Sequence, residues 1–189
     1  SMVTFCSDVD GTLIYYVSRL MELPERVPLQ CKNQFMTKES HRLLQEVRQK
    51  VEFLPVTARN VEKYIEVAED LGNPTFALVC NGAVLLKNGV PDTDWLQESK
   101  ALAEKSEEDF DRVIAFCKKQ PSVKKITWEQ GIRILITTSN TRKLREKLLA
   151  SLELETVDLW IAGKVLEIVP KSLTKGAAVR RWREQFAPK

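Results

Sequence analysis

Short apolar runs recur through the first part of the chain, and each ends in a polar turn. The runs Val3–Cys6, Val51–Val56 and Thr75–Cys80 are rich in β-branched and aromatic residues, which suit a buried pleat. Each run therefore predicts a short buried strand. The segment 15–34 shows no such pattern, and we expect a long connector there.

Segments with helical periodicity alternate with these strands. Thr37 is placed to cap one helix, and Asn60 precedes a second over Val61–Leu71, in which Val61 and Ile65 share an apolar face. Strands that alternate with helices predict a parallel sheet with right-handed crossovers, the α/β class. The polar turns after the strands then meet at one edge of the sheet, where open α/β sheets bind ligands.

The pattern changes between residues 83 and 164. Hairpin signals, two amphipathic helices and a final strand pair predict an α+β module inserted into the parallel core, which then resumes over residues 165–189. The expected elements are an Asn88-Gly89 turn, helices over Glu107–Lys119 and Thr141–Leu152, a hairpin around 129–131, and paired strands Val157–Ile161 and Val165–Val169. We interpret Trp128 and Trp160 as core residues of this module rather than as platforms for stacking sugars.

The stretch Ser7-Asp8-Val9-Asp10-Gly11-Thr12-Leu13 carries the strongest chemical signal. Alternate residues of an extended segment point the same way, so Asp8 and Asp10 can face one site. A cation or a proton would then be needed to relieve their mutual repulsion. A solvated pair in a turn is the alternative, but the position directly after a buried strand favours a functional pair.

Composition limits the class of protein and the kinds of function that the chain can have. Of 189 residues, 43% are hydrophobic and 29% charged, an ordinary balance for a globular protein. The net charge of +3 and the basic cluster around residues 180–183 are too weak to indicate nucleic-acid binding, and no apolar run is long enough to span a membrane. Four scattered cysteines indicate reduced thiols and a cytoplasmic protein, and one histidine leaves little material for histidine-based catalysis.

The first motif resembles the D-x-D-G-T motif of the haloacid dehalogenase superfamily of phosphohydrolases. The resemblance implies that Asp8 is the nucleophile that attacks phosphorus and that Asp10 is the general acid and base. It also implies Mg²⁺ as cofactor, bound by Asp8 and by the main-chain carbonyl of Asp10. The implied function is hydrolysis of a small phosphorylated metabolite, such as a sugar phosphate, through an aspartyl-phosphate.

Two further motifs of the superfamily occur in the expected order. Thr57-Ala58-Arg59 resembles the second motif, which implies phosphate binding by Thr57 and the Ala58 amide, and substrate contact by Arg59. The turn at Asn81 resembles the junction between core and cap in the superfamily, which implies a substrate contact by Asn81. A plain Asn-Gly turn explains this residue equally well. Lys175 matches the catalytic, phosphate-binding lysine of the third motif in the Cof-type and sucrose-phosphate-phosphatase-like branch. In that branch a C2-type cap selects the substrate, which implies this role for residues 83–164.

The fourth motif of the superfamily, an acidic pair that completes the Mg²⁺ site, has no counterpart. After Lys175 the only acidic residue is Glu184. The resemblance thus implies a Rossmann-like core that is incomplete at its C-terminal end, with an open edge along Val3–Ser7. A separate C-terminal segment or a second copy of the chain would pair with that edge. The alternative is a truncated or catalytically impaired module that binds a phosphorylated ligand or a complementing polypeptide.

Overall fold

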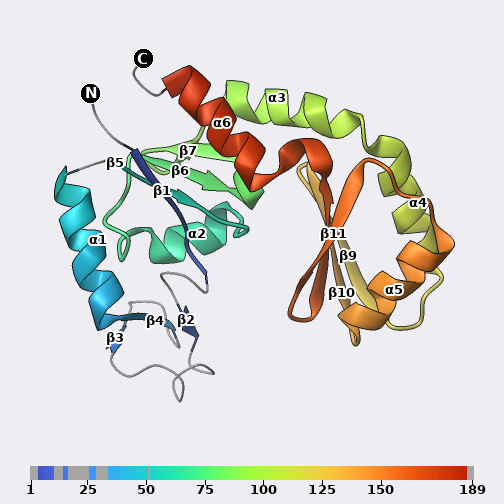
Figure 1. Ribbon diagram of the computed structural model, residues 1–189. Coiled ribbons are helices and arrows are strands. Elements are labelled where there is room, and N and C mark those ends of the chain that lie inside the picture. Colours follow the sequence, from blue (N-terminus) through green and yellow to red (C-terminus); the bar gives the residue numbers. More distant parts are fainter. Residues whose placement is uncertain (1–3, 11–14, 17–25, 29–33, 51, 187–189) are drawn as a thin grey trace. The chain divides into compact units, whose positions relative to one another are not determined.

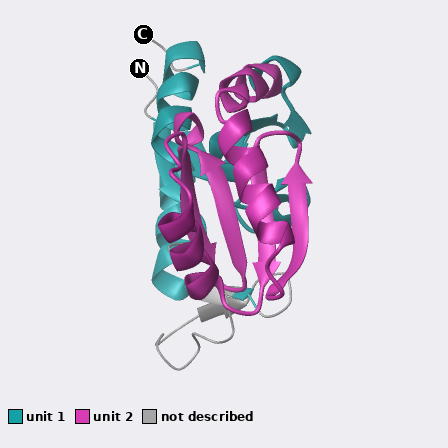
Figure 2. Ribbon diagram, turned by 90° about the vertical axis from the view of Figure 1, so that its right-hand side faces the viewer, with its two compact units in different colours: residues 1–95, 175–189 teal, residues 96–174 magenta. Residues whose placement is uncertain are grey.

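The computed structural model describes residues 4–10, 15–16, 26–28, 34–50 and 52–186. The chain forms two compact units (Figure 2), one of residues 1–95 and 175–189 and the other of residues 96–174. We call them the core unit and the inserted unit, because the second interrupts the first.

The core unit contains a five-stranded sheet of order β1-β5-β6-β7-β8 (Figure 1). Strands β1, β5 and β6 are parallel, and β7 and β8 add an antiparallel hairpin at one edge. The predicted α/β class is confirmed, with a mixed rather than purely parallel sheet. The strands are β1 (Thr4–Asp8), β5 (Glu52–Val56), β6 (Phe76–Val79), β7 (Val84–Lys87) and β8 (Val90–Pro91).

Helices cover both faces of this sheet. Figure 1 shows α6 and the start of α3 on one side and α2 on the other. Residues of β5, β6, β7, α3 and α6 form the hydrophobic core on the α6 side: Leu54, Val56, Leu78, Leu85, Trp95, Ala178 and Trp182. The helices that belong wholly or partly to this unit are α1 (Lys38–Lys50), α2 (Val61–Ala68), α3 (Thr93–Glu104) and α6 (Lys175–Phe186).

Both predicted helix caps are present. The amide of Ser40 donates to Thr37 Oγ1 at 3.1 Å, and the amide of Lys63 donates to Asn60 Oδ1 at 2.9 Å. The buried residues of α2 are Tyr64 and Val67, whereas Ile65 of the predicted apolar face is 54% exposed. The helix carries two apolar stripes, and its periodicity alone could not tell which one packs against the sheet.

The segment predicted as a connector contains strands where the structure describes it. Strands β2 (Tyr15–Tyr16), β3 (Arg26–Pro28) and β4 (Gln34–Thr37) form a three-stranded antiparallel sheet of order β2-β4-β3. These strands are too short for periodicity to reveal, and they form by pairing with one another.

The inserted unit is a four-stranded antiparallel sheet of order β11-β12-β10-β9, with α4 and α5 on one face (Figure 1). Its elements are α4 (Glu107–Lys118), β9 (Val123–Glu129), β10 (Arg133–Thr138), α5 (Thr141–Ser151), β11 (Val157–Ala162) and β12 (Val165–Pro170). The predicted hairpins and helices of this segment are confirmed. The core between sheet and helices contains Phe110, Val113, Cys117, Ile134, Ile136, Leu144, Leu148, Val157, Leu159, Leu166 and Ile168.

The boundaries of the inserted unit lie later in the chain than the predicted 82/83 and 164/165. Residues 84–91 form β7 and β8, which extend the core sheet through β6. Strand β12 pairs with β10 and β11, so residues 165–174 belong to the inserted unit. Backbone pairing decides both positions, and a hairpin signal in the sequence does not say which sheet the hairpin joins.

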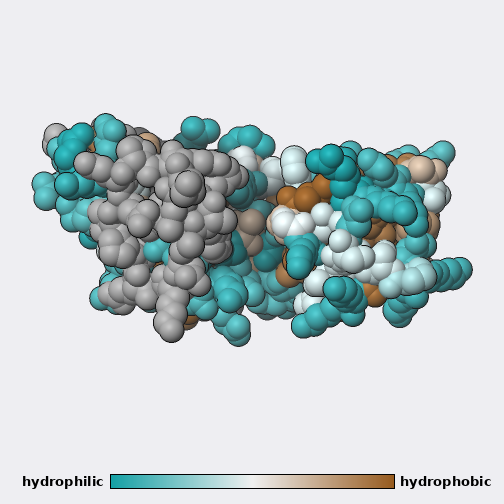
Figure 3. Space-filling model, turned by 90° about the horizontal axis from the view of Figure 1, so that it is seen from below, coloured by the Kyte–Doolittle hydropathy of each residue, from teal (hydrophilic) through white to brown (hydrophobic). Residues whose placement is uncertain are grey.

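Trp128 and Trp160 are not buried core residues, so that interpretation is wrong. Trp128 is 43% exposed and Trp160 58% exposed. Trp160 pairs in register with Glu167 of β12, on the opposite face of the sheet from the core residue Ile168. Figure 3 shows hydrophobic side chains at the surface of the inserted unit, among hydrophilic ones. In the part of the chain that the structure describes, no helix has the length and apolar character needed to cross a membrane.

Candidate active site

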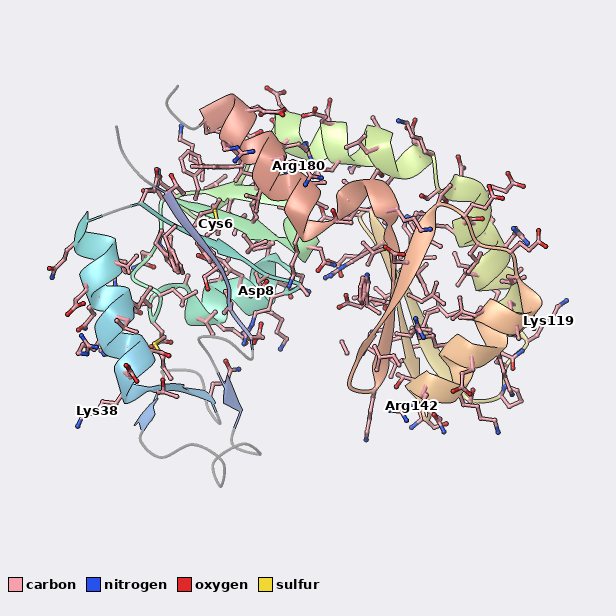
Figure 4. All side chains as sticks on the ribbon, viewed as in Figure 1. Cys6, Asp8, Lys38, Lys119, Arg142 and Arg180 are labelled. Carbon is pink, nitrogen blue, oxygen red and sulfur yellow. The ribbon has the colours of Figure 1, made fainter. Side chains whose placement is uncertain are left out.

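Asp8 and Asp10 lie at the carboxyl end of β1, where Figure 4 labels Asp8. Both residues are exposed, whereas Val9 between them is 1% exposed. The alternation that the sequence predicts therefore places the two carboxylates on the open side of the chain and the apolar side chain inside. Ser7 Oγ donates to the Asp8 carbonyl at 2.9 Å.

Lys175 contacts Asp8 although 167 residues separate them in the sequence. Its Nζ donates to Asp8 Oδ1 at 3.0 Å, an ion pair in which the side chains keep 40% and 54% of their exposure. Lys175 is the first residue of α6, so the position of that helix determines the contact.

A close approach of two small residues holds α6 against the core sheet. Gly82 has φ +95°, and a Cβ built on it would lie 2.1 Å from the Cβ of Ala178 on α6. The Gly82 carbonyl accepts a hydrogen bond from Trp95 Nε1 at 2.9 Å, and the Arg181 guanidinium of α6 stacks over the Trp95 ring at 3.8 Å. These contacts fix the helix that carries Lys175 beside the turn that follows β6.

Thr57 follows β5 and is buried, with 1% of its surface exposed. Its Oγ1 donates to Asp10 Oδ2 at 3.4 Å and accepts from the Arg59 amide at 3.1 Å. The hydroxyl is therefore part of the turn and also reaches the second carboxylate. Ala58 lies half-buried between these two residues, two positions before the cap of α2.

Arg59 binds Asp10 through two nitrogens. Nη2 lies 2.6 Å from Oδ1, and Nε lies 2.8 Å from Oδ2 and 3.1 Å from Oδ1. The same guanidinium donates to Gln34 Oε1 at 3.0 Å and to the Lys63 carbonyl at 3.1 Å. The sequence predicted that Arg59 contacts the substrate, whereas in the structure the Arg59 side chain binds Asp10.

Gln34 is the site residue that sequence reasoning missed. It is buried and contacts Arg59 from β4. No signal in the sequence identifies it, because a glutamine in a short polar segment has no distinctive spacing.

Asn81 joins the site through its backbone. Its amide donates to the Thr57 carbonyl at 2.9 Å, and the Cys80 amide donates to the Arg59 carbonyl at 2.7 Å. Asn81 has φ 60°, a left-handed conformation that asparagine tolerates in turns. Within the described residues, no hydrogen bond connects the Asn81 side chain with Asp8, Asp10 or Lys175.

The oxygen atoms at Asp8 and at the Asp10 carbonyl are of the chemical kind that binds a hard cation. Asp8 Oδ1 contacts Lys175, and no described residue donates a hydrogen bond to its Oδ2, whereas both oxygens of Asp10 are held by Arg59. Carboxylate and main-chain carbonyl oxygens are the ligands that Mg²⁺ prefers. Among the residues that the structure describes, no group of three or more His, Cys, Asp and Glu side chains is placed to hold a metal ion.

Two carboxylates and two cations thus converge at the ends of β1 and β5. One carboxylate, Asp8, is open to solvent and beside an ammonium, which suits a nucleophile that attacks an anionic group. The other, Asp10, is held in a fixed orientation by Arg59 and Thr57. This arrangement can bring an anion to a nucleophilic oxygen with a second carboxyl group nearby for proton transfer.

Comparison with known proteins identifies the family. Residues 5–121 match the sequence profile of a family described as haloacid dehalogenase-like hydrolase. The chain belongs to this family. A search of curated proteins gave no match.

Solved structures share the fold at low sequence identity. The sucrose-phosphatase of Synechocystis sp. PCC6803, solved with sucrose and phosphate, is 16% identical with a TM-score of 0.59, and the alignment covers 100% of this chain and 72% of that one. A Thermoplasma acidophilum protein is 13% identical with a TM-score of 0.64, covering 100% and 73%. A sugar phosphatase of haloacid dehalogenase subclass IIB is 16% identical with a TM-score of 0.59, covering 100% and 77%. These likenesses confirm the predicted haloacid dehalogenase fold.

Proposed function

We propose that this enzyme hydrolyses phosphomonoesters through an aspartyl-phosphate at Asp8. The observation that carries the proposal is the ion pair between Asp8 and Lys175, because two residues from opposite ends of the chain meet there as nucleophile and cation. The second carboxylate, Asp10, and the buried hydroxyl of Thr57 lie beside them. Membership of the hydrolase family supports the same reaction class.

In the first step, an oxygen of Asp8 attacks phosphorus while the bond to the leaving oxygen breaks. Lys175 stabilises the phosphoryl oxygens, and Thr57 with the Ala58 amide binds them. Asp10 protonates the leaving oxygen, then takes a proton from the water that hydrolyses the acyl-phosphate. Mg²⁺, held by Asp8 and the Asp10 carbonyl, would neutralise charge between nucleophile and phosphate.

The substrate class that we propose is a small sugar phosphate. Two proteins of the same fold are a sucrose-phosphatase, solved with sucrose and phosphate, and a subclass IIB sugar phosphatase, which supports this choice. We further propose that the inserted unit acts as a C2-type cap that selects the substrate. In this proposal Asn81 contacts the bound sugar from the core unit, whereas Arg59 is paired with Asp10.

A second candidate is a module that binds a phosphorylated ligand with little turnover. The two-nitrogen ion pair of Arg59 with Asp10 favours it, because that geometry is also typical of a purely structural pair. The two candidates agree on phosphate binding and differ in turnover.

The test is hydrolysis of p-nitrophenyl phosphate with and without Mg²⁺ by the protein and its Asp8→Asn variant. We expect Mg²⁺-dependent turnover that falls at least 10³-fold in the variant, because an amide is neither a nucleophile nor an anionic ligand. Asp94→Asn, an exposed carboxylate in the first turn of α3, is the matched control. Undiminished turnover in Asp8→Asn would remove the aspartyl-phosphate mechanism.

The Asp10→Asn variant separates the two half-reactions. The nucleophile remains, so a phosphoryl-enzyme should form with a good leaving group, while its hydrolysis slows for want of a base. Rapid-quench measurement should detect accumulated phosphoryl-enzyme. Equal rates of formation and hydrolysis in variant and parent would exclude Asp10 as the acid and base.

A further inference from the structure

The inserted unit contains a groove that the proposed reaction does not use. It has a volume of about 670 Å³ and lies where the end of α3 and the first turns of α4 meet the turn between β9 and β10. All of its lining residues belong to the inserted unit. The apolar part of the lining includes Ala103, Phe110 and Ile114.

Trp128 provides an aromatic wall of this groove. It is 43% exposed, although it pairs in register with the core residue Ile134, and its ring meets Phe110 edge to face at 4.9 Å. A Cβ at Gly131 would lie 3.6 Å from Trp128 Nε1, so this turn brings backbone close to the indole nitrogen. Part of the indole is therefore available to a ligand that enters the groove.

The charged lining residues are mainly acidic. Glu104, Glu107 and Asp111 contribute three carboxylates, against one ammonium from Lys100. Within the described chain, none of the three carboxylates forms an ion pair. The groove is thus an aromatic surface with an excess of uncompensated negative charge.

Local helix energetics do not explain this charge. The first turn of α4 favours Glu107 through the helix dipole. Glu104, however, is the last residue of α3, where the dipole disfavours an anion, and Asp111 lies four residues after Glu107, where like charges repel. Two of the three carboxylates therefore lie where their own helices make them unfavourable, and a bound cation would relieve that cost.

We propose that this groove binds a small organic polycation, an alkyl ammonium or guanidinium compound with an aliphatic body. The carboxylates pair with its charged nitrogens, and the indole face of Trp128 contacts a cationic or methylene group. All residues of this site belong to the inserted unit, whereas Asp8 and Lys175 belong to the core unit, and the proposal does not depend on the proposed phosphatase activity.

The test uses spermidine as probe and ¹H–¹⁵N spectra of the four tryptophan indole groups of the full chain as readout. We expect saturable shifts of the Trp128 signal, assigned with Trp128→Phe, and binding that weakens as salt rises. Calorimetry should show at least tenfold weaker binding for Trp128→Ala and for the double variant Glu107→Gln/Asp111→Asn.

Matched controls come from the same unit. Trp160→Ala removes an exposed tryptophan elsewhere, and Glu153→Gln with Glu155→Gln removes two exposed carboxylates outside the groove, so neither should change the affinity. Several results would overturn the proposal: no Trp128 shift at millimolar spermidine, equal weakening in the controls, or equal binding of the neutral analogue 1,4-butanediol.

Discussion

At the scale of single residues, the contact between Arg59 and Asp10 holds the second carboxylate of the candidate site in place. A guanidinium offers nitrogens in a rigid fork, and here Nε and Nη2 both reach the same carboxylate. The Arg59 side chain is 7% exposed, so its charge is shielded from water by the surrounding protein. The pair therefore orients Asp10 more firmly than a single solvent-exposed contact would.

This geometry predicts that Arg59 positions Asp10 instead of contributing mainly to substrate affinity. Arg59→Lys keeps the charge but loses the fork, so we expect kcat to fall about 10- to 100-fold with little change in KM. Steady-state kinetics on p-nitrophenyl phosphate measure both values. Arg42→Lys, in an exposed pair with Glu46 on α1, is the matched control and should change neither. A rise in KM at constant kcat would support the substrate-binding role that the sequence predicted.

At the scale of elements, the position of α6 depends on Gly82. A side chain there would overlap Ala178 and would also need φ +95°, which side chains rarely adopt. Gly89 shares the second constraint, with φ +78°, but has no neighbour within 4 Å of a built Cβ. Substitutions at the two glycines can therefore be compared to separate the cost of backbone strain from the cost of disturbed helix packing.

We predict that Gly82→Ala lowers both stability and turnover, because α6 must move and takes Lys175 with it. Strain alone should cost about 1 kcal/mol in Gly89→Ala, and the overlap should add roughly 1–3 kcal/mol in Gly82→Ala. Urea unfolding and phosphatase assays of both variants check this. Equal losses of stability in the two variants, with unchanged activity in Gly82→Ala, would contradict a positioning role for this contact.

A second element contact, in the inserted unit, gives a pH dependence. Asp109 on α4 accepts hydrogen bonds from Thr156 Oγ1 at 2.6 Å, from the Thr156 amide at 2.8 Å and from the Glu155 amide at 3.1 Å. Burial raises the pKa of Asp109, but these hydrogen bonds and the nearby Arg112 outweigh that effect and hold the pKa below the ordinary value of an aspartate. The carboxylate therefore ties the loop before β11 to α4 most strongly when it is ionised.

Because the folded pKa is depressed, the stability from Asp109 is present above about pH 4, the unfolded pKa, and is lost as pH falls through the folded value. We expect Asp109→Asn to cost about 1–3 kcal/mol at pH 7 and to flatten the loss of stability as the pH falls below about 4. Urea unfolding across this range measures it. Glu146→Gln, an exposed carboxylate on α5 of the same unit, should leave the pH profile unchanged.

Elements with strong periodicity or clear caps were predictable, and elements that depend on distant pairing were not. Strands β5 and β6, the Asn60 cap and the hairpin of β9 and β10 follow from local patterns. Helix α3 was not predicted, although Asp92 caps it by accepting from the Trp95 amide at 2.8 Å, because the stripe that it buries, Trp95, Ser99 and Ala103, contains a polar and a small residue and gives a weak apolar pattern. The sequence placed Asp8, Asp10, Thr57 and Lys175 in motifs, but the pairing of Arg59 with Asp10 and Gln34 depends on segments that meet only in the fold.

At the scale of the whole molecule, the core unit is assembled from two segments that the inserted unit separates. Lys175 and α6 return to a sheet formed by the first 95 residues, so the candidate site exists only when both segments have folded together. The same sheet has β1 at one edge and β8 at the other. Among the described strands, β1 pairs only with β5.

We propose that the edge of β1 opposite β5, which no other described strand pairs with, accepts a strand from a second copy of the chain. Phe5 on this strand is 43% exposed and stacks on Phe53 of β5, so apolar surface accompanies the backbone groups of this edge. Light scattering after size exclusion should show a mass that rises with concentration toward a dimer. Phe5→Lys should shift this equilibrium toward monomer at least tenfold, because a charge at an edge opposes strand pairing.

Val90→Lys, on the exposed opposite edge strand β8, should leave the mass unchanged. A monomer of constant mass at all concentrations, or equal effects of the two variants, would show that β1 does not pair in this way.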